Sequence, residues 1–217
     1  MKKSIVFILC FFSIFGLMAQ VEKSDSMFVS VSVIKSNSLY IGIENPVSIG
    51  ITNLCGRLPS VKVSCGEIRY SGNGQYVIKV DGKCINGITL MILDSENKND
   101  TLATYNFRCK KVPDPVIKLA GQSDSATISK NMVLAQLGIY ADMADFEYDF
   151  RIKILSFAMS TRKHTEPILS ETGKFSSKQY EFIKTIKPGE RIYLTDVKAL
   201  FPDGDIRSMP GYSFFVK

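Results

Sequence analysis

The sequence predicts a mainly β protein made of two tandem immunoglobulin-like β-sandwich domains, the second of which carries one or two short helices. Three observations predict this fold. Short alternations of apolar and polar residues, separated by turn residues, fill residues 27–109. Helical periodicity is found only beyond the neighbouring prolines Pro113 and Pro115. All four cysteines that follow residue 19 lie before these prolines.

The first domain is expected to hold six or seven strands, because its apolar segments are short and turn signals recur about every 8 to 12 residues. Asn45-Pro46 is expected to break the second segment. The chain has no tryptophan, so the Cys…Trp…Cys signature of antibody domains is missing and the likeness is architectural. The segments are MFVSVSVI (27–34), YIGIENPVSIGI (40–51), SVKVSC (60–65), GQYVIKV (74–80), GITLMIL (87–93) and LATYNFRC (102–109).

The second domain is expected to be a sheet with short helices packed on it. In SKNMVLAQLG (129–138), Ser129 can cap a short helix that the closing glycine ends. The segment FEYDFRIKILSF (146–157) alternates apolar with charged residues, which indicates a half-buried strand. RIYLTDVKALF (191–201) and YSFFVK (212–217) flank PDGD and predict a closing β-hairpin.

The clearest helix signal is KFSSKQYEFIKTIKPGE (174–190). Ser176 and Gln179 form an S-x-x-Q capping box, which marks the start of a helix. Phe175 and Tyr180 occupy the positions of a hydrophobic staple around that start. The Pro-Gly pair near the end of the segment is expected to stop the helix.

VPDPV (112–116) is expected to be a short, stiff connector. Proline fixes its own backbone and lacks an N–H donor, so a central strand cannot continue through Pro113 and Pro115. The predicted domains are therefore residues 20–112 and residues 113–217.

Residues 1–19 are expected to be a cleaved signal peptide. Two lysines precede an apolar run of about 15 residues that ends in the small residue Ala19. A membrane-spanning helix needs about 20 apolar residues, and no later segment meets that requirement. Lipid attachment at Cys10 is the minor alternative, because Leu9 stands where a lipoprotein signal has a small residue. The mature protein is expected in the periplasm or at the cell surface, without a transmembrane segment.

Cys55, Cys65, Cys84 and Cys109 are candidate disulfide partners, because an oxidising compartment favours disulfides. Four cysteines allow three connectivities, between which the sequence does not choose, and four buried thiols are the alternative. No C-x-x-C pair occurs, and the single histidine, His164, lies far along the chain. Neither a zinc site nor another cofactor is therefore expected.

No catalytic residue is predicted. The acidic run DMADFEYD (142–149) has aromatic residues between its acids, which favours a solvated strand face over a calcium loop. Ser160 and Lys163 match S-x-x-K, but they follow a predicted strand and lack the companion motifs of serine acyl-enzymes. His164 is expected to be an exposed loop residue. The net charge is +6, and acids nearly balance bases in both domains, so nucleic acid is not expected as a partner.

Three tripeptides resemble the Asp-Ser/Thr-apolar acceptors of a bacterial periplasmic O-glycosylation system. They are DSM at Asp25, DTL at Asp100 and DSA at Asp124. All three lie in polar segments, where a sugar can be accommodated. Modification at these positions stays open.

Five segments, in chain order, resemble the last two periplasmic domains of the GldM family of gliding motility proteins. They are YIGIENPVSIGI, GNGQYVIKV, FRCKKVPDPVIKLAG, FEYDFRIKILSF and IKPGERIYLTDVKALFPDGDIRSMPGYSFFVK. The resemblance spans about Leu39 to Lys217, and VPDPV is among its most specific parts. It implies two immunoglobulin-like domains at the end of a periplasmic stalk, which in that family belongs to the motor of gliding and type IX secretion. That stalk dimerises and reaches toward an outer-membrane ring of partner proteins.

The chain also departs from the family pattern. Members of the family have an N-terminal membrane helix, whereas this chain is expected to have a signal peptide followed almost at once by the first of the two domains. A motor role is not expected to transfer, because use of a proton gradient requires a membrane segment. The four cysteines are also not part of the family pattern.

The sequence therefore indicates a non-catalytic protein-interaction module, with envelope proteins as partners and a homodimer as a further expectation. A role accessory to gliding or type IX secretion competes with a free-standing adhesin or carbohydrate-binding protein. A carboxylate-dependent envelope hydrolase is the remaining alternative, which requires two carboxylates about 5 to 10 Å apart in a concave pocket.

Overall fold

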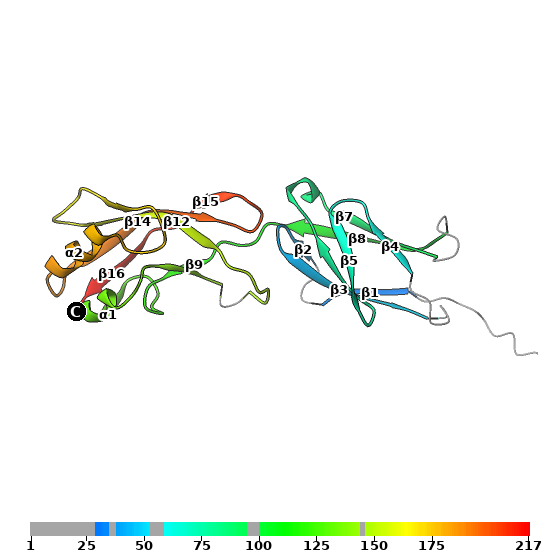
Figure 1. The fold of residues 1–217 in the computed structure, drawn as a ribbon, viewed down its shortest axis with the longest axis horizontal. Helices are drawn as coiled ribbons and strands as arrows, with labels where there is room; N and C mark the ends of the chain where they lie inside the picture. Colours follow the sequence, from blue (N-terminus) through cyan, green and yellow to red (C-terminus); the bar gives the residue numbers. More distant parts are fainter. Residues whose placement is uncertain (1–28, 35–37, 53–58, 95–99, 144–145) are drawn as a thin grey trace, which may run out of the picture.

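A computed structural model describes residues 29–34, 38–52, 59–94, 100–143 and 146–217. The predicted signal peptide, Cys55 and the DSM tripeptide lie outside these residues. The described chain is mostly β-strand and forms an N-terminal half (residues 29–112) and a C-terminal half (residues 113–217), which lie end to end (Figure 1). Among the described residues, no helix is long and apolar enough to cross a membrane.

The N-terminal half consists of two four-stranded sheets, with the strand orders β1-β3-β6-β5 and β2-β8-β7-β4. All pairs are antiparallel except β2 with β8. The inward faces enclose one core that includes Leu39, Val47, Ile78 and Leu90. This arrangement confirms the predicted immunoglobulin-like class. The elements are β1 (Val29–Val33), β2 (Ser38–Tyr40), β3 (Glu44–Ile51), β4 (Ser60–Val63), β5 (Glu67–Gly72), β6 (Gln75–Lys79), the 3₁₀ helix η1 (Gly82–Cys84), β7 (Ile88–Leu93) and β8 (Thr101–Lys110).

The break between β2 and β3 does not fall at Asn45-Pro46, as predicted from the sequence, but at the turn that contains Gly42. Pro46 lies inside β3 opposite Val77 of β6, and its carbonyl accepts a hydrogen bond from the Ile34 N–H at 3.1 Å. The buried Asn45 side chain accepts from the Tyr40 N–H at 2.7 Å and donates to the Tyr40 carbonyl at 3.0 Å. The amide therefore closes the turn, and the chain continues as a strand through the proline.

The C-terminal half has a six-stranded sheet in the order β10-β16-β14-β12-β13, with β15 paired to β14, and a two-stranded sheet of β9 and β11. Phe157, Ile192, Leu194 and Phe214 are fully buried in its core. The elements are β9 (Val116–Lys118), β10 (Ala126–Ile128), α1 (Lys130–Leu134), β11 (Tyr140–Asp142), β12 (Lys153–Thr161), β13 (Ile168–Ser170), α2 (Ser177–Thr185), β14 (Arg191–Leu200), β15 (Ile206–Ser208) and β16 (Tyr212–Val216).

The start of α2 agrees with its sequence signals. The Ser176 hydroxyl accepts from the Gln179 N–H, and the Gln179 side chain accepts from the Ser176 N–H, so both bonds of the capping box are present. The staple residues Phe175 and Tyr180 meet edge to face, with ring centroids 5.6 Å apart. The helix buries Ile183 against the sheet core.

Replacing Ser176 by alanine is expected to lower the free energy of unfolding by about 1 kcal/mol, because the N–H of Gln179 loses its cap. Ser177→Ala is the matched control, since Ser177 is exposed at the first helical position. Urea unfolding of both variants measures the difference. Equal stability of the two variants would contradict a contribution from the capping box.

The predicted strand at 146–157 is only partly present, because β12 begins at Lys153. Phe146 and Tyr148 instead pack against Tyr40 of the N-terminal half, with centroid distances of 4.8 and 5.3 Å and edge-on geometry. The aromatic residues of the alternation therefore serve the contact between the halves. The predicted hairpin across PDGD joins β14 to β15, and β16 pairs with the other end of β14.

Candidate binding surface

The connector predicted at VPDPV lies between β8, which ends at Lys110, and β9, which begins at Val116. Val112 is buried in the core of the C-terminal half, and Pro115 is buried as well. The connector is therefore packed at Val112 and Pro115, whereas Pro113 and Asp114 between them are exposed.

Arg207 of β15 secures the connector. One of its guanidinium nitrogens donates to the Val112 carbonyl at 2.7 Å, and the other pairs with Asp203 at 2.5 Å. The guanidinium carbon lies 3.8 Å from the ring centroid of Phe201, which adds a cation–π contact. Nearby, Lys111 pairs with Asp205 at 2.5 Å and lowers the pKa of that carboxyl through a hydrogen bond and its charge.

Arg207→Gln is expected to lower the free energy of unfolding by about 2 kcal/mol, because the Asp203 carboxylate is only 4% exposed and loses its counter-charge. Arg69→Gln is a matched control, since its pair with Glu44 has side chains that are 58% and 63% exposed. Such exposed pairs contribute well under about 1 kcal/mol. Urea unfolding measures both variants, and an equal loss of stability in the two would contradict this role of Arg207.

The two halves also meet backbone to backbone at Gly42. This residue has φ +85°, and a Cβ at this position would lie 2.4 Å from the Asp203 nitrogen and from the Pro202 carbonyl carbon. Two hollows flank this contact, one beside Glu44 and Asp149 and one beside Glu67, Asp81 and Asp203.

A separate concave surface lies on the C-terminal half, at the end of β14 remote from this joint. We call it the distal pocket. Arg162, Lys163, Glu190, Arg191, Tyr193 and Phe215 line it, and its volume is about 400 Å³. β14 supplies the arginine and tyrosine at alternate positions, so both project from the outer face of the sheet. Phe215 lies opposite Arg191 on β16.

Aromatic contacts and hydroxyl groups hold the guanidinium of Arg191. Its carbon lies 5.4 Å from the Tyr193 ring centroid and 5.1 Å from that of Phe215. Its Nε donates to the Ser213 hydroxyl at 3.2 Å, and its Nη2 donates to the hydroxyls of Ser213 and Ser125 at 2.6 and 2.8 Å. No hydrogen bond joins Nη1 to any described residue.

Asp124 extends this hydrogen-bond network through Ser125 and Ser213. It accepts hydrogen bonds from the Ser125 hydroxyl and from both the N–H and the hydroxyl of Ser213. Burial alone raises the pKa of Asp124, but the hydrogen bonds from Ser125 and Ser213, with the charge of Arg191, lower it overall. The carboxyl is therefore ionised at neutral pH and orders the serines that hold the arginine.

The remaining charges of the pocket differ in their pairing. Lys163 pairs with Glu190, and this hydrogen bond is the main cause that lowers the pKa of Glu190. Arg162 is exposed and forms no hydrogen bond or ion pair with the described residues. The pocket therefore carries three cations and one carboxylate.

The sequence did not predict the distal pocket, because its residues come from three strands and their loops. The outward alternation of Arg191 and Tyr193 was the available signal.

The sequence candidates for chemistry do not converge on a site. Asp142 pairs with Lys118, Glu147 and Asp149 are exposed, and Asp145 lies outside the described residues. These acids do not share a strand face, because the chain is irregular from 146 to 152. Lys163 of the S-x-x-K motif is paired with Glu190.

His164 is exposed, and its ring lies 5.0 Å from that of Phe182, as measured between centroids. Its Nδ1 is 3.0 Å from the Glu166 carbonyl oxygen, so the ring contacts the loop and the face of α2. Thr101 and Ser125 of the two described tripeptides are both exposed.

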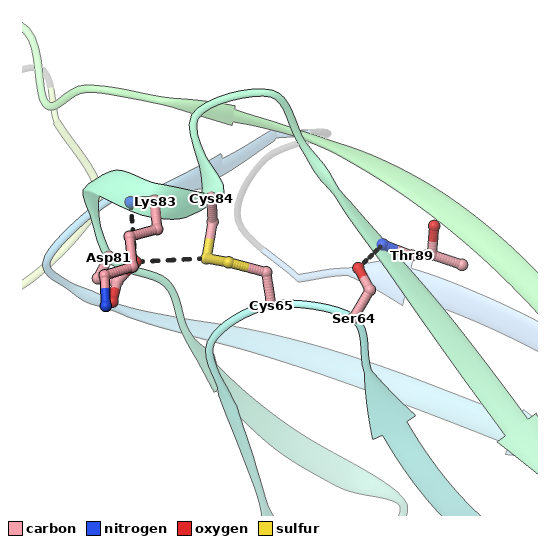
Figure 2. The surroundings of a disulfide bond; sticks show 6 residues. All are labelled: Ser64, Cys65, Asp81, Lys83, Cys84 and Thr89. Atoms are coloured by element: carbon pink, nitrogen blue, oxygen red, sulfur yellow. Dashed lines mark hydrogen bonds between the residues drawn. A yellow bond between two sulfur atoms is a disulfide. The ribbon is translucent and has the colours of Figure 1, made fainter.

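A disulfide joins Cys65 to Cys84 and ties the β4–β5 loop to η1 (Figure 2). The Asp81 carboxylate accepts from the Lys83 N–H and caps η1, with one oxygen 3.6 Å from the Cys84 sulfur. A disulfide sulfur carries no proton, so this last distance is a contact only. Within the described ranges, these two cysteines and Asp81 form the one group with metal-ligand spacing, and the disulfide occupies its sulfurs.

Cys109, a candidate disulfide partner from the sequence, is a free buried thiol on β8, and burial raises its pKa. Its side chain belongs to the apolar core of the N-terminal half. Nothing is described for Cys55.

Two family models match consecutive parts of the chain. The GldM third domain matches residues 28–110, and the GldM C-terminal domain matches residues 113–217. The chain belongs to the GldM family. The two matched GldM regions meet at the connector that Arg207 secures. A comparison with curated proteins found no match.

Two of the solved structures similar to this GldM-family chain are tandem modules of low identity. Three N-terminal domains of the bacteriophage RB49 outer capsid protein Hoc are 9% identical, with 88% of this chain and 70% of that chain covered and a TM-score of 0.28. The fibronectin(III)-like modules of Clostridium thermocellum CbhA are 15% identical, with 88% and 94% covered and a TM-score of 0.27.

Proposed function

We propose that this GldM-family chain is a non-catalytic protein-interaction module of the bacterial envelope, accessory to gliding or type IX secretion. The observation that carries the proposal is the consecutive match of the GldM third and C-terminal domains over residues 28–217. Domains of this family are components of motility machinery. Export through the signal peptide at residues 1–19 would place the chain in the periplasm or at the cell surface.

The joint between the halves supports this proposal. We infer that the two domains span residues 20–112 and 113–217, with the boundary inside the VPDPV connector. The joint between the halves is held by the hydrogen bond from Arg207 to the Val112 carbonyl, by the close backbone approach at Gly42 and by the aromatic cluster around Tyr40. A joint with so many contacts presents two binding surfaces at one fixed distance, which suits a spacer between protein partners.

Two experiments test the proposal. A tagged chain, crosslinked in cells of its own host, is expected to recover envelope proteins, including components of the outer-membrane ring. Deletion of the gene is expected to reduce export of type IX secretion cargo. Recovery of no envelope protein from a well-expressed chain would contradict the interaction role. Blue-native electrophoresis or light scattering of the purified chain tests the expected homodimer.

A free-standing adhesin or carbohydrate-binding protein is the second candidate, because the aromatic rings of Tyr193 and Phe215 line the distal pocket. This candidate predicts normal export of cargo after deletion of the gene. The export assay therefore separates it from the accessory role.

The hydrolase alternative has weaker support. The hollows at the joint do contain carboxylates, but Glu44 pairs with Arg69, Asp203 pairs with Arg207 and Asp81 caps η1. Hydrogen bonds from lysines lower the pKa of Glu190 and of Asp205. A general acid of a glycosidase needs a raised pKa, which is the opposite direction.

A further inference from the structure

The distal pocket has the features of a site for a carboxylate group beside an apolar side chain. Its lining holds three cations, Arg162, Lys163 and Arg191, and one carboxylate, Glu190. Its volume of about 400 Å³ lies in the range of ligand pockets and suits one or two amino-acid side chains. Tyr193 and Phe215 supply the apolar wall.

Two donor groups in this pocket are available to a ligand. Nη1 of Arg191 carries two N–H groups that make no hydrogen bond with the described residues. The guanidinium of Arg162 likewise has no hydrogen bond or ion pair among them. Arginine binds carboxylates through paired, charge-assisted hydrogen bonds, which are stronger than bonds between neutral groups.

The position of Arg191 is set before any ligand arrives. Two aromatic rings and two serine hydroxyls hold its guanidinium, and Asp124 orders both serines. A group that is already ordered loses little conformational freedom on binding, so more of its interaction energy contributes to affinity. Tyrosine and arginine are also among the residue types that contribute most at protein interfaces.

From this geometry we propose that the distal pocket binds an acidic peptide segment of a partner protein. One carboxylate of that segment is placed against Arg162 and Nη1 of Arg191, and a neighbouring apolar side chain is placed on Tyr193 and Phe215. The proposal rests on the proposed function, because a protein partner follows from membership in a motility complex. An acidic sugar carries the same anionic group and is an outcome of the test.

The test is a titration of the isotopically labelled chain from Gln20 onward, followed by NMR. The probe is the peptide Ac-Glu-Glu-Phe-Glu-NH₂, with Ac-Gln-Gln-Phe-Gln-NH₂ and glucuronic acid as comparisons. Saturable shifts are expected at residues 161–163, 189–193 and 215 with the acidic peptide only. The affinity is expected to fall as the salt concentration rises, because charges dominate the contact.

Arg162→Gln is expected to weaken binding of the acidic peptide about tenfold, since one charge-assisted hydrogen bond is lost. This variant removes no side-chain hydrogen bond or ion pair with the described residues. Arg191→Lys keeps the charge, loses the planar fork and is expected to weaken binding as well. Arg108→Gln is the matched control, because the Arg108 side chain is exposed on β8 of the other half and forms no hydrogen bond or ion pair with the described residues.

Several results would overturn the proposal: no saturable shift, equal shifts with the glutamine peptide, binding of glucuronic acid alone, or equal affinity of Arg162→Gln and Arg108→Gln. Capture of envelope proteins by the unmodified chain is measured in parallel. If envelope proteins are captured but the acidic peptide does not bind the distal pocket, the proposed peptide site is wrong and the interaction role stands. If capture fails while the peptide binds, the interaction role fails and the site stands.

Discussion

Gly42→Ala is expected to separate the two halves of the molecule without unfolding either of them. The added Cβ would lie 2.4 Å from backbone atoms of Pro202 and Asp203, which cannot move aside as a flexible side chain can. The residue also has φ +85°, where a side chain costs about 1–2 kcal/mol. Relief of this strain requires the turn that contains Gly42 to move away from the turn between β14 and β15.

Small-angle X-ray scattering measures the effect as a broader distribution of intramolecular distances. Thermal unfolding is expected to shift to lower temperature, since the contact between the halves is lost. Gly50→Ala is the matched control, because Gly50 lies in β3 with open space where its Cβ would be. If the two variants scatter and melt alike, the backbone contact at Gly42 does not hold the joint.

Removal of the disulfide by Cys65→Ala with Cys84→Ala is expected to lower the free energy of unfolding by about 3 kcal/mol. The bond closes a loop with a sequence separation of 19 residues, and its loss restores conformational freedom to the unfolded chain. The loss is concentrated in the N-terminal half, because both cysteines pack on its core.

Urea unfolding with and without a dithiol reductant measures this contribution. The natural chain and Cys109→Ala are both expected to lose stability on reduction, since Cys109 is a free thiol. The double variant is expected not to respond to the reductant. If the unfolding midpoint of the natural chain is the same with and without the reductant, the disulfide is either not formed or does not stabilise the fold.

These two effects differ in how far the sequence could predict them. The cysteines were visible as candidates, but their pairing depends on which loops the sheets bring together. η1 places Cys84 next to the β4–β5 loop, whereas β8 places Cys109 inside the apolar core. Gly42 carried no signal of its own, because its partner, the Pro202–Asp203 backbone, is about 160 residues away along the chain.

Local signals predicted local structure well. The structure contains the capping box and the hydrophobic staple predicted around Ser176, because such contacts involve residues a few positions apart. The alternation at 146–157 was misleading in its first half. Its aromatic residues pack on Tyr40 instead of pairing as a strand, and alternation alone cannot distinguish these two uses of an apolar residue.

The sequence by itself determined the β class, the helix start at Ser176 and the connector at VPDPV, since these depend on backbone preferences of neighbouring residues. It also carried the segments by which the GldM family is recognised. The tertiary structure decided the disulfide pairing, the contact at Gly42 and the distal pocket. These features join residues from different strands and loops, and only the packing of the sheets brings such residues within reach of one another.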